Sequence, residues 1–85
     1  KKERKQAQID HAGHISREGA LVKVADKIAN VRDVGANPPR DWEPERRKEY
    51  LDWAERVVER CRPENAALTG YFYESLENAR EALAN

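Results

Sequence analysis

The chain has 85 residues, enough for one small domain or for part of one. Its 16 basic and 16 acidic side chains balance and are interspersed, so we expect neither a nucleic-acid partner nor a membrane partner, both of which favour a basic excess. No apolar run approaches the roughly 20 residues that span a bilayer. The single cysteine, Cys61, excludes an internal disulfide and fits a reducing compartment, which makes a cytoplasmic location the expectation.

Two helices are predicted in the first half of the chain. The first covers about residues 2–12 and ends near Gly13. Ser16 is placed to cap the second, which we expect over residues 17–34, with Gly35 at its end. One face of this second helix is predicted to carry Leu21, Val24, Ala25, Ile28, Val31 and Arg32. The opposite face carries Lys23, Asp26, Asn30 and Asp33.

Two more helices are predicted in the second half. Pro44 suits the first turn of a helix over residues 44–62, and Pro63 ends it. The expected buried residues of this helix are Tyr50, Leu51, Ala54, Val57, Val58 and Cys61. A fourth helix over residues 64–84 would bury Leu68, Phe72, Leu76, Ala79 and Leu83. Without any strand-like alternation, the predicted fold class is all-α, a bundle of about four helices; the periodicity and two tryptophans disfavour disorder.

The polar stripe of Lys23, Asp26 and Asn30 is the first candidate site. Spacings of three and four bring these side chains together on one helix face. A carboxylate, an ammonium and a carboxamide could hold a metal ion, a phosphate and the edge of a base or sugar. The alternative, which spacing alone favours, is the solvated face of an amphipathic helix.

Arg46 and Tyr50 form the second candidate site, because residues four apart are neighbours on a helix. Arginine can grip a phosphate with two hydrogen bonds, and a tyrosine ring can stack on a base. The alternative has Arg46 exposed and Tyr50 at the edge of the core. Trp42 and Trp53 are interpreted as packing residues. One cysteine and two histidines give no zinc-binding spacing.

Two segments favour the functional interpretation of these candidate sites over the structural one. Residues 21–34, LVKVADKIANVRDV, resemble the LVKLADKLxNLRDL helix of the RelA/SpoT-type hydrolases of guanosine bis-diphosphates. Residues 42–54, WEPERRKEYLDWA, are similar to the WSxxRxxEYFxWA helix of their single-domain metazoan relatives. The resemblance covers about residues 5–60. It implies the all-α HD fold and manganese-dependent removal of the 3′-pyrophosphate from ppGpp or a related nucleotide.

By motif position, the resemblance implies that Asp26 is a metal ligand and that Lys23, Asn30, Arg46 and Tyr50 contact the nucleotide. The family also needs an upstream histidine and a His-Asp dyad, and neither is present in this chain. We therefore expect residues 1–85 to be the C-terminal part of one HD-type domain, catalytically inactive alone. Self-association through an exposed apolar face of the Asp26 helix is expected. The alternative is a small helical interaction module, or a degenerate HD remnant, without catalysis.

Overall fold

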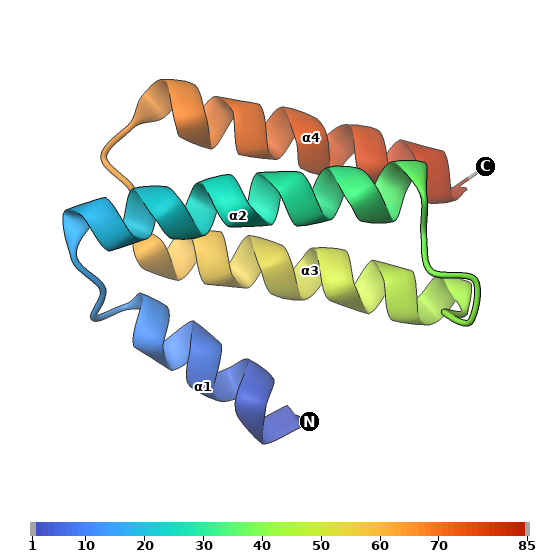
Figure 1. Cartoon of the computed structure of the whole chain (residues 1–85), viewed down its shortest axis with the longest axis horizontal. Coiled ribbons are helices and arrows are strands. Elements are labelled where there is room, and N and C mark those ends of the chain that lie inside the picture. The colour runs from blue at the N-terminus through green and yellow to red at the C-terminus, as the bar shows by residue number, and fades with distance from the viewer. Residues whose placement is uncertain (1, 85) are drawn as a thin grey trace.

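The computed structural model describes residues 2–84, and within this range the chain is all-α. Four helices follow one another: α1 (Lys2–Ala12), α2 (Arg17–Ala36), α3 (Pro44–Cys61) and α4 (Ala66–Ala84). Figure 1 shows α2, α3 and α4 running alongside one another, with α1 inclined to them and packed against α3. The predicted fold class, all-α with about four helices, is confirmed. None of the helices described is long and apolar enough to cross a membrane.

Local chemistry sets where three of the helices begin. The Ser16 side chain accepts a hydrogen bond from the Gly19 backbone N–H at 3.0 Å, which caps α2 as predicted. Pro44 opens α3 at a position where its missing N–H costs nothing. Helix α4 begins at Ala66, two residues later than predicted, because the Asn65 side chain accepts from the Leu68 N–H at 2.9 Å.

The core lies where α2, α3 and α4 meet. Its fully buried part is formed by Phe72, Leu51, Leu76, Val24, Val31, Val57 and Val58. Ile9 and Ala12 attach α1 to it. The predicted inward residues of α3 and α4 all lie in this core or pack against it. The buried residues of α2 are Ala20, Val24, Lys27, Ile28, Val31 and Val34.

Two residues predicted on the buried face of α2 lie outside: Ala25 and Arg32 are exposed. Helix α2 packs against both α3 and α4, which turns its buried face toward Lys27 and Val34 and leaves Ala25 and Arg32 at the far edge.

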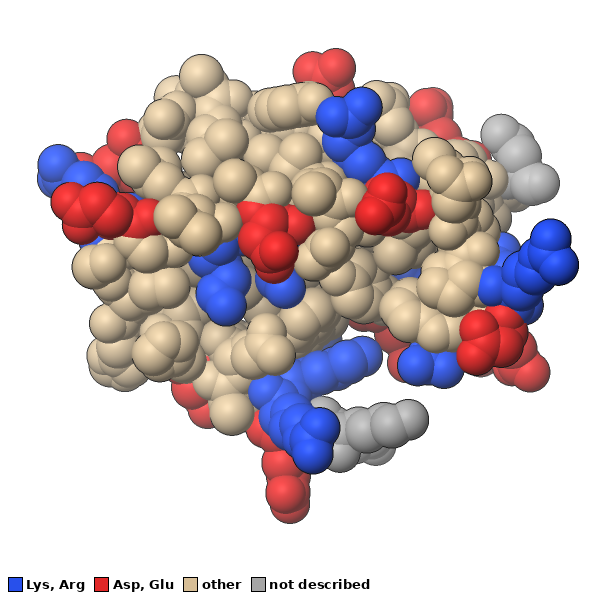
Figure 2. Space-filling view, viewed as in Figure 1, with Lys and Arg blue, Asp and Glu red and all other residues tan. Residues whose placement is uncertain are grey.

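The outward side of α2 carries three exposed apolar residues among the carboxylates of Glu18, Asp26 and Asp33. Val22 is 70% exposed, and Ala25 and Ala29 are exposed beside it. We call these three residues the outer stripe. In the view of Figure 2, uncharged side chains predominate and charged groups are scattered among them.

Candidate functional site

Asp26 and Asn30 meet on α2 as their spacing predicts. The Asn30 Nδ2 donates to Asp26 Oδ2 at 3.3 Å, across one turn of helix. The Asp26 side chain is 57% exposed, so its carboxylate remains accessible to a ligand from solvent. Asn30 is half-buried and lies on the side of α2 that faces Tyr50 of α3.

Tyr50 of α3 joins this pair from the other side of the α2–α3 contact. Burial of the phenol raises the pKa of Tyr50, and the negative charge of Asp26 raises it further, while a hydrogen bond with the Asn30 side chain opposes both effects. The hydroxyl therefore stays protonated and able to donate over the whole neutral range. The structure thus brings together Asp26, Asn30 and Tyr50, which lie up to 24 positions apart in the sequence.

Arg46 lies next to this group, on the face of an aromatic row. Its Cζ is 4.5 Å from the centroid of the Trp42 ring, and the Trp42 and Tyr50 rings are tilted against each other at 5.6 Å. Tyr50 in turn contacts Trp53, whose ring centroid is 5.5 Å away. Stacking on Trp42 orients the guanidinium while leaving its N–H groups for an anion, because cation–π contact uses the face and not the donors.

A groove of about 240 Å³ runs along this aromatic row between α1 and α3. Its walls combine three cations with three aromatic rings: Arg4, Lys5, Arg46, Trp42, Tyr50 and Trp53. Positive charge together with flat ring surfaces suits a phosphorylated aromatic ligand such as a nucleotide. The contribution of α1 was not predicted from the sequence, because Arg4 and Lys5 reach this groove only through the packing of α1 on α3.

Lys23 stands apart from the other predicted site residues. It lies half-buried one turn before Lys27, and the charges of both lysines act on the thiol of Cys61. Burial is the main influence on that thiol and raises the pKa of Cys61, while the two lysines partly offset the rise. Among the residues described, Lys23 makes no side-chain hydrogen bond or ion pair with Asp26 or Asn30. The predicted stripe of three is therefore a pair, Asp26 and Asn30, with Lys23 directed toward the α3 side.

Lys27 is the site residue that sequence reasoning missed. It is only 5% exposed, and its Nζ lies 3.5 Å from Asp26 Oδ2 and 4.4 Å from the centroid of the Trp53 ring. Burial lowers the pKa of Lys27, with a further lowering by the charge of Lys23, and the neighbouring Asp26 works in the opposite direction. The signal was present in the sequence: Lys27 continues the inward row of Val24 and Val31 at spacings of three and four.

Asp26 can serve a metal ion as one ligand among several. Asn30 and Lys27 both contact the Oδ2 atom of this carboxylate, so Oδ1 is left for a cation. Within residues 2–84, however, no three His, Cys, Asp or Glu side chains gather in a way that could hold a metal. The described residues therefore fit a contribution of one carboxylate to a metal site and do not form such a site by themselves.

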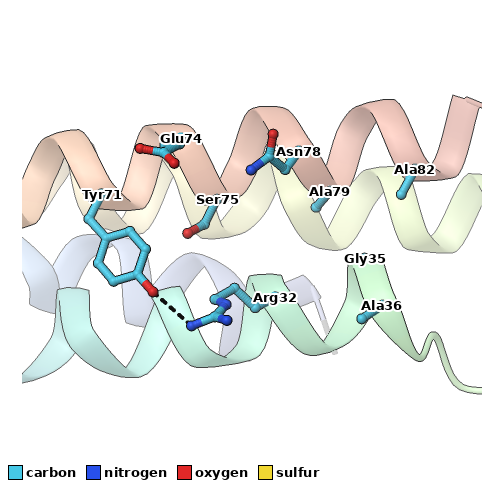
Figure 3. A pocket seen from close by; sticks show the side chains of 9 residues that line it. All are labelled: Arg32, Gly35, Ala36, Tyr71, Glu74, Ser75, Asn78, Ala79 and Ala82. Carbon is cyan, nitrogen blue, oxygen red and sulfur yellow. Dashed lines mark hydrogen bonds between the residues drawn. The ribbon is translucent and has the colours of Figure 1, made fainter.

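A second groove, of about 420 Å³, lies between α2 and α4 and holds none of the predicted site residues. Figure 3 shows Tyr71 and Ser75 of α4 pointing toward α2. The groove is also lined by Glu74 and Asn78 of α4 and by Arg32, Gly35 and Ala36 of α2. The Arg32 Nη1 donates to the Tyr71 hydroxyl at 2.7 Å and closes one end of this groove. Several of its lining residues are glycine or alanine, and these small residues allow α2 and α4 to pack closely beside the groove.

Comparison with known proteins relates the chain to pyrophosphohydrolases of guanosine 3′,5′-bis(diphosphate). It is 44% identical over 68 residues to guanosine-3′,5′-bis(diphosphate) 3′-pyrophosphohydrolase MESH1 of Danio rerio, which is 80% of this chain and 38% of that protein. MESH1 of Drosophila melanogaster is 46% identical over 68 residues, and MESH1 of Xenopus tropicalis 44% over 70. The resemblance read from residues 21–34 and 42–54 is confirmed.

The chain spans 38–39% of the length of these relatives. No family model matches the chain. No solved structure matches it either.

Proposed function

We propose that the chain is the C-terminal part of an HD-type phosphohydrolase that removes pyrophosphate from ppGpp or a related nucleotide. In this proposal the 85 residues supply one metal ligand and the nucleotide-contacting side chains, and they are inactive alone. The observation that carries the proposal is the meeting of Asp26, Asn30 and Tyr50 across α2 and α3, in a chain 44% identical to a hydrolase of that nucleotide.

In this proposal Asp26 binds the metal ion, which we propose to be manganese. Its exposed carboxylate lies on a rigid helix and offers Oδ1 to a cation. The metal supplies Lewis-acid chemistry and a more acidic bound water when the complete site is formed. The remaining ligands come from outside the described residues, since no three His, Cys, Asp or Glu side chains gather there in a way that could hold a metal ion.

The proposed nucleotide contacts are Lys23, Asn30, Arg46 and Tyr50. Arg46, oriented on Trp42, grips a phosphate with charge-assisted hydrogen bonds. Tyr50 donates its hydroxyl or offers its ring edge, and Asn30 beside it reads a base or sugar edge. Lys23 adds positive charge from the half-buried side of α2 and offsets phosphoryl charge. Together with Arg4 and Lys5 of the groove, these residues favour a polyphosphorylated ligand over a neutral one.

The test is manganese-dependent release of pyrophosphate from ppGpp by the full-length gene product that contains these residues. Asp26→Ala should abolish release, while Asp33→Ala, which removes another exposed carboxylate from the same helix, should leave it intact. Loss of release in both variants would point to a general effect on α2. Release that survives Asp26→Ala would refute the metal role of Asp26.

The choice of nucleotide has its own test, because the groove fits phosphorylated aromatic ligands as a class. A panel of guanosine and adenosine polyphosphates, with and without a 3′-pyrophosphate, separates the proposed substrate from related ones. Preference for ppGpp that is reduced by Arg46→Ala supports a contact with the phosphate. Equal turnover of all nucleotides would refute a specific ppGpp hydrolase.

A second candidate function is an interaction module without catalysis. The exposed outer stripe favours it, since Val22, Ala25 and Ala29 form an apolar surface that a partner could cover. Manganese binding by the full-length protein separates the two functions, because the module requires none. We also propose a cytoplasmic location, consistent with the free thiol of Cys61, which imaging of a fluorescent fusion would test.

A further inference from the structure

We propose that Lys27 is a positioning residue for Asp26: its ammonium, held over the Trp53 ring, fixes Oδ2 of that carboxylate and leaves Oδ1 for a divalent cation. The inference deepens the proposed function and rests on Asp26 being the metal ligand. It assigns a role to a side chain that the resemblance to known hydrolases did not single out.

The first step is the location of the Lys27 charge. The side chain is 6% exposed, so its ammonium has lost most of its water, and a charge in that position requires partners inside the protein. Its recorded partners are the Asp26 carboxylate at 3.5 Å and the face of the Trp53 ring at 4.4 Å. Indole is the aromatic ring that holds a cation best, and the interaction strengthens when water is excluded.

The second step is that Trp53 is itself fixed in place. Its Nε1 donates to the backbone carbonyl of Lys5 in α1 at 3.2 Å, and its ring contacts Tyr50 within α3. The ring is buried, with 6% of its surface exposed. Lys27 therefore connects Asp26 to a platform that α1 and α3 hold together, so the carboxylate is positioned by three helices and not by α2 alone.

The third step is the choice of oxygen. Neighbouring residues on a helix point in different directions, yet the Lys27 Nζ lies within 3.5 Å of Asp26 Oδ2 while it stands over the Trp53 ring. Asn30 and Lys27 both contact Oδ2 of Asp26, at 3.3 and 3.5 Å. When one carboxylate oxygen is held by neighbours, the carboxylate keeps a fixed orientation for a ligand at the other oxygen. Outer partners of this kind typically contribute about 10–100-fold to metal affinity or activity.

The test compares Lys27→Met and Lys27→Arg in the full-length gene product. Methionine keeps an apolar stem of similar length and removes the charge, and arginine keeps the charge. We expect Lys27→Met to weaken manganese binding about 10-fold, measured from the EPR signal of free Mn²⁺. Lys27→Arg should weaken it less, because it keeps the positive charge. Lys48→Met, which removes an exposed lysine from α3, is the matched control and should bind as the unmodified protein does.

Thermal unfolding separates positioning from a purely structural role. Lys27→Met should keep or raise the Tm, because it removes a desolvated charge and retains the packing of the stem. The proposal is overturned if Tm and manganese affinity fall together, or if affinity is unchanged in Lys27→Met. Lack of manganese binding by the unmodified protein would overturn it as well. Manganese binding that depends on Asp26 without ppGpp hydrolysis would refute only the proposed substrate.

A second measurement does not depend on activity or on metal. The Lys27 ammonium protons should give a distinct signal in ¹⁵N-correlated NMR spectra, displaced upfield by the Trp53 ring. Asp26→Asn should move this signal, and Asp33→Asn should not. A Lys27 signal that is indifferent to Asp26→Asn would show that the two side chains do not interact, which contradicts the proposal.

Discussion

Gly35 of α2 lies directly against Ala79 of α4: a Cβ added at Gly35 would come within 2.8 Å of the Ala79 Cβ and 2.9 Å of its Cα. We predict that Gly35→Ala lowers the free energy of unfolding by about 1–3 kcal/mol, since backbone atoms of α4 would have to move to admit the methyl group. Urea denaturation followed by circular dichroism measures this change.

The matched control is Gly70→Ala in α4. Gly70 is also helical and has no atom within 4 Å of an added Cβ, so the change brings only the better helix propensity of alanine. We expect Gly70→Ala to stabilise the protein by up to about 1 kcal/mol. Equal effects of the two substitutions would show that the close approach of α2 and α4 is not maintained in solution.

The same contact explains one error of sequence reasoning. Gly35 was predicted to end the second helix, yet α2 continues to Ala36, because a glycine can also be required for close packing. Start positions set by local chemistry, at Ser16 and Pro44, were predictable. The start of α4 was placed two residues too early, because Asn65 was not recognised as its capping residue.

The candidate site was predictable only in part, because the sequence gives the spacing within one helix and not the packing between helices. Asp26 and Asn30 lie one turn apart, and a helix alone brings them together. The platform under them was not predictable, because the contact of Lys27 with Trp53 joins positions 26 apart and exists only once α2 packs on α3. Without that packing, Lys27 looks like one more surface lysine among many.

We predict that Cys61 reacts slowly with thiol reagents in the folded protein. The side chain is buried, and burial raises the pKa of its thiol, so little reactive thiolate is present at neutral pH. The rate of modification by 5,5′-dithiobis(2-nitrobenzoate) at pH 7.5 should increase many-fold on addition of denaturant. A folded protein that reacts as fast as the denatured one would show that the contact between α3 and the core opens readily.

The buried Lys27 predicts a dependence of stability on pH. Burial, with a smaller effect of Lys23, lowers the pKa of Lys27 in the folded protein below its ordinary 10.5, so the unfolded chain holds this proton more tightly. Where the unfolded state binds more protons, stability rises with pH. The contribution of Lys27 to the free energy of unfolding should therefore rise as the pH increases from its lowered value toward 10.5, and level off above it.

The measurement takes the difference in unfolding free energy between the unmodified protein and Lys27→Met at pH 7, 8, 9 and 10. Taking this difference reduces the contribution of Tyr50 and Tyr73, whose raised pKa values remove stability above pH 10 in both proteins. We expect the unmodified protein to gain relative to the variant over the part of this range that lies above the lowered pKa of Lys27. A difference that stays constant over this range would mean that the Lys27 ammonium is not desolvated.

The outer stripe predicts how residues 1–85 behave when isolated. Val22 is exposed over 70% of its surface, with Ala25 and Ala29 exposed beside it. We expect the isolated chain to self-associate through this stripe, since apolar surface on a helix is buried when two copies meet. Sedimentation velocity over a concentration series should show a sedimentation coefficient that rises with concentration, and Val22→Lys should suppress the rise.

Ala7→Lys is the control, because it adds the same charge at an exposed position of α1, on a helix that packs mainly against α3. Association that persists in Val22→Lys and disappears in Ala7→Lys would place the contact on α1 instead. A monomer at all concentrations with a sharp thermal transition would favour the interaction module. Part of a larger hydrolase domain is instead expected to associate when its apolar stripe is exposed to water.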